Sequence, residues 1–236
     1  MHPSQPLSLV WIDDYHGGDP LFVQSLARGL AAQPPDHRRA ILVLGGLDRA
    51  QRLLEANAIP VEVRDGVPIS ADPAARALIE RACREVNKEA VAVLTEFGVP
   101  AVGIQGCDRG LLTIAESRIT PPSVAWLEKI VANGAVPVVS ALAAGRYVRP
   151  VPIGKALAAL ATGFSGADIR VILFLRDPSI RHKSNKNIYL SDISRVMADH
   201  DVKVVRKLLS DGIRVVVTDA RSAFGGEQDT YLQIST

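Results

Sequence analysis

The stretch "LVWIDDYHGGDP", residues 9–20, passes from an apolar strand into the capped start of a helix. Asp19 offers a side-chain acceptor to the free N–H groups of that helix, and Pro20 is tolerated at its first position. Many α/β enzymes hold a phosphate-binding loop between such a strand and helix. Here the loop contains Asp13 and Asp14. The stretch therefore predicts a strand-to-helix unit of an α/β fold, with two carboxylates where phosphate is often bound.

Apolar runs of strand length recur along the chain, and most are separated by segments with helical periodicity. This alternation predicts an α/β fold with an open, mainly parallel sheet and helices on both faces. The runs are "LSLVWI" (7–12), "AILVL" (40–44), "VEV" (61–63), "PAVGI" (100–104), "AVPVVS" (135–140), "IRVILFL" (169–175) and "IRVVVT" (213–218).

The sequence also predicts several helix boundaries. Asp72–Pro73 and Thr120–Pro121 predict two further helix starts, because each pairs a capping side chain with proline at the first helical position. An apolar stripe predicts one long helix over residues 73–97. Gly134 and Gly212 immediately precede strands, as glycines that end helices do.

Composition limits the class of protein. The chain has 236 residues, of which 47% are hydrophobic, enough for one large α/β domain or two lobes that share a sheet. Its 27 basic and 25 acidic residues are interspersed, so the sequence predicts no concentrated positive charge that would bind nucleic acid or a membrane surface. Cys83 and Cys107 lie outside any Cys-x-x-Cys pattern, and the sequence shows neither the apolar h-region typical of signal peptides nor an apolar run of about 18 residues. We expect a reduced, cytoplasmic, soluble protein whose partner is a small-molecule metabolite.

From Ala40 onward, the order of features resembles the amino acid kinase family, most closely its acetylglutamate kinases. "ILVLGGLDRAQ" is similar to the family's second strand and glycine loop, and "REVNKEAVAVLTEFGVPAVGIQGCDRGLL" to its Val-Asn-Lys helix and next strand. "NGAVPVVSALAAG", "PIGKALAALATGFSGADIRVILFLRDPS" and "LLSDGIRVVVTDARS" resemble later segments in the same order.

The resemblance implies a single αβα sandwich over residues 1–236, with a substrate-side lobe at 1–150 and a nucleotide-side lobe at 151–236. It implies transfer of a phosphoryl group from ATP to a carboxylate. It further implies a homo-oligomer that pairs through the 73–97 helix, or pairing with an active homologue.

The chain departs from the family at the end of the first strand. The family has Lys-x-Gly-Gly there, but the position of the lysine holds Trp11 or Tyr15, depending on the alignment. No lysine precedes Lys88, so no alignment of the N-terminal third supplies that positive charge.

Two later motifs depart as well. Pro68 stands where the family has an arginine for the substrate carboxylate, so the two-pronged grip on an acidic amino acid is missing there. Ile153 and Lys155 replace the asparagine and the aspartate of the family's Asn-Ala-Asp motif, which reverses one charge.

The resemblance, together with the residues themselves, suggests candidate roles for several positions. It implies ATP and Mg as cofactors if kinase activity is retained; otherwise the cofactor is unknown, and we predict no resident metal. The catalytic candidates are Lys155 and Asp177, the nucleotide-binding candidates are Gly45, Gly46, Arg176 and Lys203, and the small-molecule candidates are Asp13, Asp14, His16 and Asn87.

Asp13 and Asp14 disfavour the binding of a nucleotide at the end of the first strand. A triphosphate carries roughly four negative charges, and its repulsion from carboxylates grows severalfold where water is excluded. Each lost lysine or positioned donor lowers the rate of phosphoryl transfer by about 10²–10³-fold. Our first hypothesis is therefore a non-catalytic small-molecule-binding, regulatory or partner subunit.

The alternative hypothesis is a divergent kinase that phosphorylates the carboxylate of an N-acyl amino acid. Electrostatic stabilisation needs charge at a place rather than one residue type, and Lys155, Arg49 or Arg176 could supply it.

A third hypothesis is a divalent metal site. Alternation would place Asp14 and His16 on one side of an extended chain, beside Asp13. The plainer interpretation is that Asp13, Asp14, His16, Gly17 and Gly18 form a turn, and that the two aspartates face water beside the helix start.

Overall fold

The computed structural model describes residues 6–115, 118–120, 122–164, 166–176, 187–224 and 232–235. Its main sheet contains β1 (Leu7–Ile12), β2 (Ala40–Leu44), β5 (Ala101–Gln105), β8 (Val136–Ser140), β11 (Ile169–Leu173), β12 (Asn187–Tyr189), β13 (Arg214–Val217) and β14 (Leu232–Ser235). The spatial order is β12-β14-β13-β11-β1-β2-β8-β5. Neighbouring strands are parallel except β13 and β14, which are antiparallel. The predicted open, mainly parallel sheet is confirmed.

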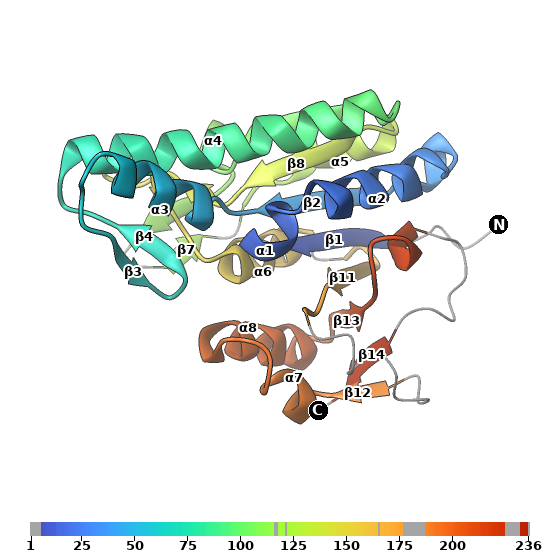
Figure 1. Cartoon of the computed structure of the whole chain (residues 1–236). Helices are drawn as coiled ribbons and strands as arrows, with labels where there is room; N and C mark the ends of the chain where they lie inside the picture. The colour runs from blue at the N-terminus through green and yellow to red at the C-terminus, as the bar shows by residue number, and fades with distance from the viewer. Residues whose placement is uncertain are drawn as a thin grey trace.

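Helices and small hairpins connect these strands (Figure 1). The α-helices are α1 (Asp14–Gly17), α2 (Pro20–Ala31), α3 (Leu47–Ala56), α4 (Pro73–Glu96), α5 (Ala125–Ala132), α6 (Ile153–Gly163), α7 (Leu190–Ile193) and α8 (Asp199–Ser210). The hairpins are β3 (Glu62–Arg64) with β4 (Val67–Ile69), β6 (Thr113–Ala115) with β7 (Arg118–Thr120), and β9 (Leu142–Ala143) with β10 (Arg149–Pro150). Short 3₁₀ turns lie at Pro35–His37, Asp108–Gly110 and Ser222–Phe224.

Strand β1 shows why both faces of the sheet are covered. All of its residues are buried, and successive side chains point to opposite faces. Leu9 and Trp11 belong to the core cluster that includes residues of α5, α6 and α8. Val10 and Ile12 belong to the cluster formed with α2 and α4. The chain is thus an αβα sandwich, with α2 and α4 on one face of the sheet and α6 on the other (Figure 1).

The capping signals near β1 and α4 act as predicted. The carboxylates of Asp19 and Asp72 accept backbone hydrogen bonds in the first turns of α2 and α4, at 2.9 and 2.8 Å. Gly134 and Gly212 follow helices with positive φ values of 74° and 76°, a conformation that suits glycine. Helix α4 covers the predicted long segment to within one residue.

The predicted helix start at Thr120–Pro121 is wrong, and Pro121 lies outside the described residues. Thr120 ends β7, and α5 begins at Ala125. The Thr120 hydroxyl donates to the carbonyl of Thr113 on the paired strand, at 3.2 Å, so this side chain serves the hairpin.

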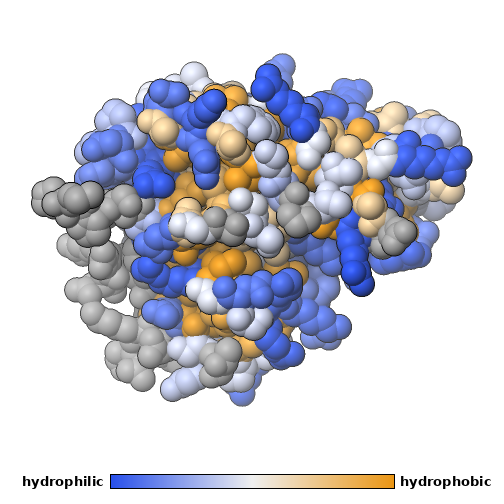
Figure 2. All heavy atoms as spheres, turned by 180° about the vertical axis from the view of Figure 1, so that it is seen from behind, coloured by the Kyte–Doolittle hydropathy of each residue, from blue (hydrophilic) through white to orange (hydrophobic). Residues whose placement is uncertain are grey.

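The outer surface mixes polar and apolar character. Figure 2 views the molecule from behind and shows hydrophobic residues towards the middle of that face, with hydrophilic residues around them. None of the described helices has both the length and the apolar composition needed to cross a bilayer.

Candidate functional site

A cavity of about 400 Å³ lies at the carboxyl ends of β1 and β11, where open α/β sheets bind ligands. We call it the strand-end cleft. It is lined by Trp11, Asp13, Asp14, Leu47, Asp48, Asp65, Gly66, Pro152, Ile153, Leu173, Phe174, Leu175, Arg176, Val196, Met197, Ala198, His200 and Asp201.

Asp13, at the end of β1, connects this strand with Arg176, which follows β11. Its Oδ1 accepts the backbone N–H of His16 at 2.8 Å and lies 2.6 Å from His16 Nδ1, so it caps the short helix α1. Its Oδ2 accepts hydrogen bonds from the Arg176 guanidinium at 3.2 Å. Burial alone would raise the pKa of Asp13, but the hydrogen bonds from His16 and the charges of His16 and Arg176 hold it below its usual value. Asp13 is therefore an engaged, ionised carboxylate.

Asp14 faces a different partner. Its Oδ1 accepts the N–H of Leu47 at 2.7 Å, at the start of α3. Burial raises the pKa of Asp14 to about 6, the hydrogen bond from Leu47 opposes that rise, and the charges of Asp48 and Asp13 add to it. The neighbouring aspartates thus differ in partner and in the direction of their pKa shifts.

The extended geometry expected for a metal site is not present. Asp14 and His16 lie within α1. Among the residues that the structure describes, no group of three or more His, Cys, Asp or Glu side chains is arranged to hold a metal ion. The metal hypothesis for Asp13, Asp14 and His16 therefore gains no support.

His16 is held among aromatic rings. It is 8% exposed, and its ring centroid lies 4.7 Å from that of Phe22, 5.8 Å from Phe174 and 5.2 Å from Tyr15. The guanidinium of Arg176 lies 4.8 Å from the Tyr15 ring centroid. His16 therefore packs in the interior. The acidic pair does not simply face water, because Asp13 and Asp14 are half-buried and hydrogen-bonded.

The two glycines of the β2–α3 loop, Gly45 and Gly46, lie in close contact with α6 and α4. A Cβ at Gly46 would lie 2.9 Å from the backbone of Cys83 on α4. One at Gly45 would lie 3.0 Å from Ile153 on α6 and 3.4 Å from Asp14 Oδ2. Each glycine therefore allows a close approach between elements of this chain.

The floor of the cleft is filled by an indole. Trp11 is 4% exposed, and a Cβ added at Gly154 in the first turn of α6 would overlap its ring. Trp11 therefore occupies the space between the end of β1 and the start of α6.

The turn of the β3–β4 hairpin contacts both α6 and α8. Asp65 and Gly66 have positive φ values of 49° and 73°, as a tight hairpin turn requires. Lys155 Nζ on α6 donates to Asp65 Oδ2 at 3.0 Å. His200 on α8 packs so closely that a Cβ at Gly66 would lie 3.0 Å from its Nε2. The hairpin turn thus closes over one end of the cleft.

Negative charge dominates the strand-end cleft. Asp13, Asp14, Asp48, Asp65 and Asp201 line it, against the cationic Arg176 and the imidazole of His200. Burial raises the pKa of Asp201, His200 opposes that rise, and the charges of Asp13 and Asp65 add to it. The carboxylates therefore outnumber the groups that can balance them.

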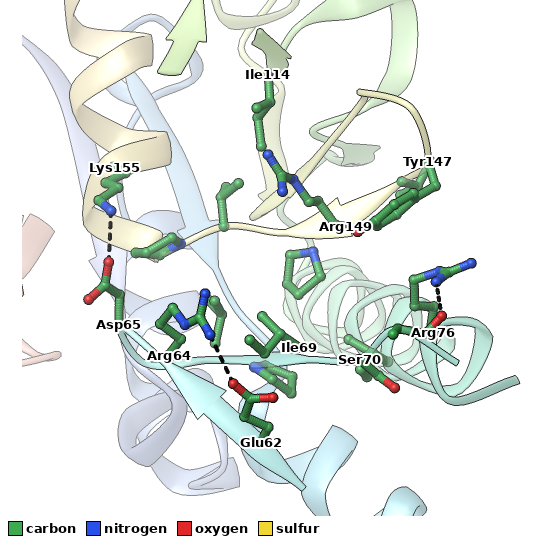
Figure 3. Close-up of a pocket in the computed structure, with 18 of the residues that line it drawn as sticks. Glu62, Arg64, Asp65, Ile69, Ser70, Arg76, Ile114, Tyr147, Arg149 and Lys155 are labelled. Carbon is green, nitrogen blue, oxygen red and sulfur yellow. Dashed lines mark hydrogen bonds and ion pairs between the residues drawn. The ribbon is translucent and has the colours of Figure 1, made fainter. Parts of the chain in front are cut away.

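A second cavity, of about 510 Å³, lies on the other side of the hairpin, and we call it the hairpin pocket (Figure 3). It is bounded by β3, β4, β10, the start of α4 and the β6–β7 hairpin. Its lining residues are Glu62, Arg64, Asp65, Val67, Pro68, Ile69, Ser70, Ala71, Arg76, Ile79, Ile114, Ile119, Tyr147, Val148, Arg149, Pro150, Val151, Pro152 and Lys155.

Among curated proteins, the chloroplastic acetylglutamate kinase of Arabidopsis thaliana is 28% identical over 192 residues, which cover 74% of this chain and 51% of that protein. The acetylglutamate kinase of Nautilia profundicola is 25% identical over 181 residues, covering 74% and 61%. The chain is thus similar to acetylglutamate kinases over 74% of its length, which is consistent with the amino acid kinase family. It spans between half and two thirds of the length of these two relatives. No protein-family model matches it.

The fold agrees with that family. A crystal structure of isopentenyl phosphate kinase superposes with a TM-score of 0.65 at 14% sequence identity, covering 96% of this chain and 98% of that one. At this identity the likeness concerns the fold alone.

Within this acetylglutamate kinase-like chain, the predicted nucleotide residues do not converge. Arg176 lines the strand-end cleft, and Gly45 and Gly46 pack as described. Lys203 is an exposed residue of α8 that lines neither cavity. Asp177 lies outside the described residues.

Asn87 lies away from both cavities. It is 2% exposed, and its Nδ2 donates to the carbonyls of Val138 at 2.7 Å and Ile104 at 3.4 Å. Its Oδ1 accepts from Gln105 Nε2 at 3.4 Å. The structure places this predicted small-molecule residue in a buried network between α4, β5 and β8, where it joins backbone groups.

Of the hairpin pocket, sequence reasoning reached only Pro68 and Lys155. Its arginines, Arg64, Arg76 and Arg149, come from separate segments and form no motif. One signal was available, because Asp65–Gly66 between two short apolar runs is a typical hairpin turn.

Proposed function

We propose that this acetylglutamate kinase relative is a non-catalytic small-molecule-binding protein that serves a regulatory or partner role. The observation that carries the proposal is the set of five aspartates around the strand-end cleft. In the family that the chain resembles, the first strand ends in a lysine and glycines that let phosphate approach the backbone. Here it presents carboxylates, so a ligand other than a nucleotide is favoured.

The residues of the cleft do not fit a triphosphate. Arg176 already pairs with Asp13, and Lys155 already pairs with Asp65. Trp11 fills the floor beside α6. A triphosphate would meet uncompensated carboxylates in a site partly shielded from water, where repulsion is severalfold stronger than in bulk solvent.

A divergent carboxyl kinase is the second candidate. It is supported by Arg176, which lines the cleft after β11, and by Lys155 on α6, which pairs with the cleft residue Asp65. For catalysis, Lys155 would have to leave Asp65 to stabilise charge on a transferred group.

Titration calorimetry with MgATP and an assay of ADP release test the proposal. We expect no measurable MgATP binding, and no ADP release above background with a panel of N-acetylated amino acids. Turnover at an ordinary enzyme rate, on the order of 10 s⁻¹, would overturn it.

Lys155→Ala separates the two candidates if any turnover is found. A kinase that relies on Lys155 loses its activity in this variant and keeps it in Lys129→Ala, which removes an exposed lysine on α5. Equal activity in both variants would reject the role of Lys155.

The proposal extends to organisation and location. We assign residues 1–150 to a substrate-side lobe and 151–236 to a nucleotide-side lobe of one domain; most residues of the hairpin pocket come from the former. We propose pairing through α4 and the edge strand β5, with a second copy or an active homologue. The cytoplasm is the proposed location, and the free thiols of Cys83 and Cys107 suit it.

A further inference from the structure

We propose that a third cavity, between α2 and α4, binds a small apolar molecule that carries one amino group, with Asp14 and Asp48 facing the cationic head. We call it the α2–α4 cavity. The inference rests on the proposed non-catalytic binding function and names a ligand class for it. Among its lining residues, the cavity shares Asp13, Asp14 and Asp48 with the strand-end cleft and none with the hairpin pocket.

The α2–α4 cavity lies on the face of the sheet that α2 and α4 cover, opposite α6 (Figure 1). Its floor is formed by Ile12 of β1 and by Leu42 and Leu44 of β2, which belong to the core cluster on that face. Helix α4 adds Ala90 and Val93 as one wall. The short helix α1 and the first turns of α3 line the end that adjoins the strand-end cleft. The cavity thus extends along the α2–α4 face, away from that cleft.

The size and the floor of the cavity define the body of the ligand. The volume is about 230 Å³, below the range of about 300–1,000 Å³ typical of sites for drug-sized molecules. The floor and the α4 wall are hydrocarbon, so they favour an apolar body that displaces water from them. A short alkyl chain fits both observations.

Most of the charged groups that line the cavity already have partners. The lining contains four carboxylates and two guanidinium groups. Arg49 donates to both carboxylate oxygens of Glu89 at 2.9 Å and to Glu85 at 3.3 Å. Asp13 accepts hydrogen bonds from Arg176 at 3.2 Å. Arg49, Glu89 and Asp13 are therefore matched within the protein.

The charged lining groups that remain are Asp14, Asp48 and Arg52. In the described part of the chain, none of these three forms an ion pair. Asp14 is half-buried, and the charge of Asp48 adds to the rise in its pKa, so the two carboxylates repel each other. Arg52 is exposed, and water and salt screen its charge. A cation beside Asp14 and Asp48 would relieve their repulsion, whereas an anion would add to it.

The head group that fits these carboxylates is a primary ammonium. It presents three N–H donors and no acceptor, and ionised carboxylates only accept hydrogen bonds. Hydrogen bonds between two such charged groups are stronger than those between neutral groups. The ligand class is therefore a primary amine on a short apolar chain, with the chain on the floor of the cavity and the ammonium at its acidic end.

Calorimetric titration of the full chain with pentylamine tests the inference, and pentanol and pentanoate are the neutral and anionic analogues of similar length. We expect pentylamine to bind with a dissociation constant on the order of 1 mM, because so small a ligand makes few contacts. Pentanol should bind more weakly, and pentanoate should not bind. Pentanoate binding as tightly as pentylamine would contradict the proposed selection of a cation.

Ala90→Leu is the decisive variant, and Ala92→Leu is its matched control. Ala90 lines the α2–α4 cavity, whereas Ala92 is an exposed residue of the same helix that lines none of the three cavities. The larger side chain at position 90 occupies the space of the alkyl chain. We expect the affinity for pentylamine to fall about tenfold or more in Ala90→Leu and to stay unchanged in Ala92→Leu.

Two charge variants locate the ammonium. Asp48→Asn should weaken pentylamine binding about five- to tenfold, while Glu55→Gln, at an exposed position of α3 outside the three cavities, should leave it unchanged. Asp201→Asn tests the strand-end cleft, because Asp201 lines that cleft and not the α2–α4 cavity. We expect no change in this variant. Asp48→Asn also keeps the test open if Ala90→Leu does not fold, as judged by circular dichroism.

Three further outcomes would overturn the inference: no binding of pentylamine to the unaltered protein, unchanged binding in the folded Ala90→Leu and Asp48→Asn variants, or a loss in Asp201→Asn or a control variant as large as in those two. These results are distinct from failure of the proposed function. ADP release at an enzyme rate overturns the non-catalytic function and leaves amine binding to be judged by the titrations alone.

Discussion

The carboxyl group of Asp14 lies against the first turn of α3, where burial, opposed by the hydrogen bond from Leu47, raises its pKa to about 6. Its usual value of 3.8 applies when the chain is unfolded. The folded state therefore binds this proton more tightly than the unfolded state does. The resulting stabilisation is present below pH 3.8 and is lost as the pH rises through about 6.

Asp14→Asn should remove that pH dependence. Asparagine keeps a carbonyl oxygen for the Leu47 N–H and carries no charge, so we expect the variant to be more stable than the natural chain at pH 7, by about 1–3 kcal/mol. Urea unfolding at pH 4 and pH 7 measures the difference. Asp36→Asn, at an 80% exposed side chain, is the control and should leave the pH slope unchanged. An unchanged slope in Asp14→Asn would contradict the assignment.

Sequence reasoning reaches some of these residues and misses their surroundings. The absence of lysine before Lys88 and the acidic pair at Asp13 and Asp14 are visible without a structure. The direction of each carboxylate is not, because Asp13 turns toward His16 and Asp14 toward Leu47 only once α1 forms. The Asp13–His16 contact is local, whereas Asp14 reaches Leu47 on another element, and the fold rather than local spacing determines that second contact.

Among the elements, the contact between β1 and α6 is the tightest that a simple substitution can test. Gly154→Ala would force a methyl group into the Trp11 ring, and we expect a loss of about 1–3 kcal/mol in the free energy of unfolding. Gly17→Ala is the control, since its Cβ would lie 3.4 Å from Ile12, an ordinary contact. Chemical denaturation measures both variants.

A double variant checks the cause of that loss. Trp11→Leu combined with Gly154→Ala should be destabilised by less than the sum of the two single changes, because the smaller side chain leaves room for the methyl group. Strict additivity would show that the overlap with the indole is not responsible.

At the level of elements, apolar runs and caps were the informative signals. The starts of α2 and α4 follow directly from Asp19–Pro20 and Asp72–Pro73. Thr120–Pro121 has the same pattern and ends a hairpin strand, because threonine also suits strands and its hydroxyl reaches Thr113. A capping pair alone does not distinguish these two uses.

On the scale of the whole molecule, the sheet ends at β5, whose outer edge has no neighbouring strand among the described residues. Val102 on this strand is 38% exposed. If pairing uses this edge and α4, Val102→Glu should convert a dimer to a monomer with its circular dichroism unchanged. Light scattering coupled to size exclusion measures the mass. Val63→Glu changes a 43% exposed valine on the β3–β4 hairpin and should leave the mass unchanged.

The overall architecture was within reach of the sequence, and the second cavity was not. Alternating strands and helices, together with the order of family-like segments, predict the sandwich. The hairpin pocket needs Arg76, Tyr147 and Arg149 to meet beneath a hairpin, and these residues are brought together by the packing of β10 beside β4 and α4. Such a site becomes visible only when the tertiary fold is known.

The indole of Trp11 over Gly154 also limits which side chains position 11 can accept. A lysine at position 11 would bury an ammonium group where the side chain is 4% exposed, and it would leave a void above a residue that has no side chain to fill it. A cationic side chain at position 11 is therefore disfavoured unless position 154 changes with it. The two positions are coupled, so each constrains the side chains that the other can accept.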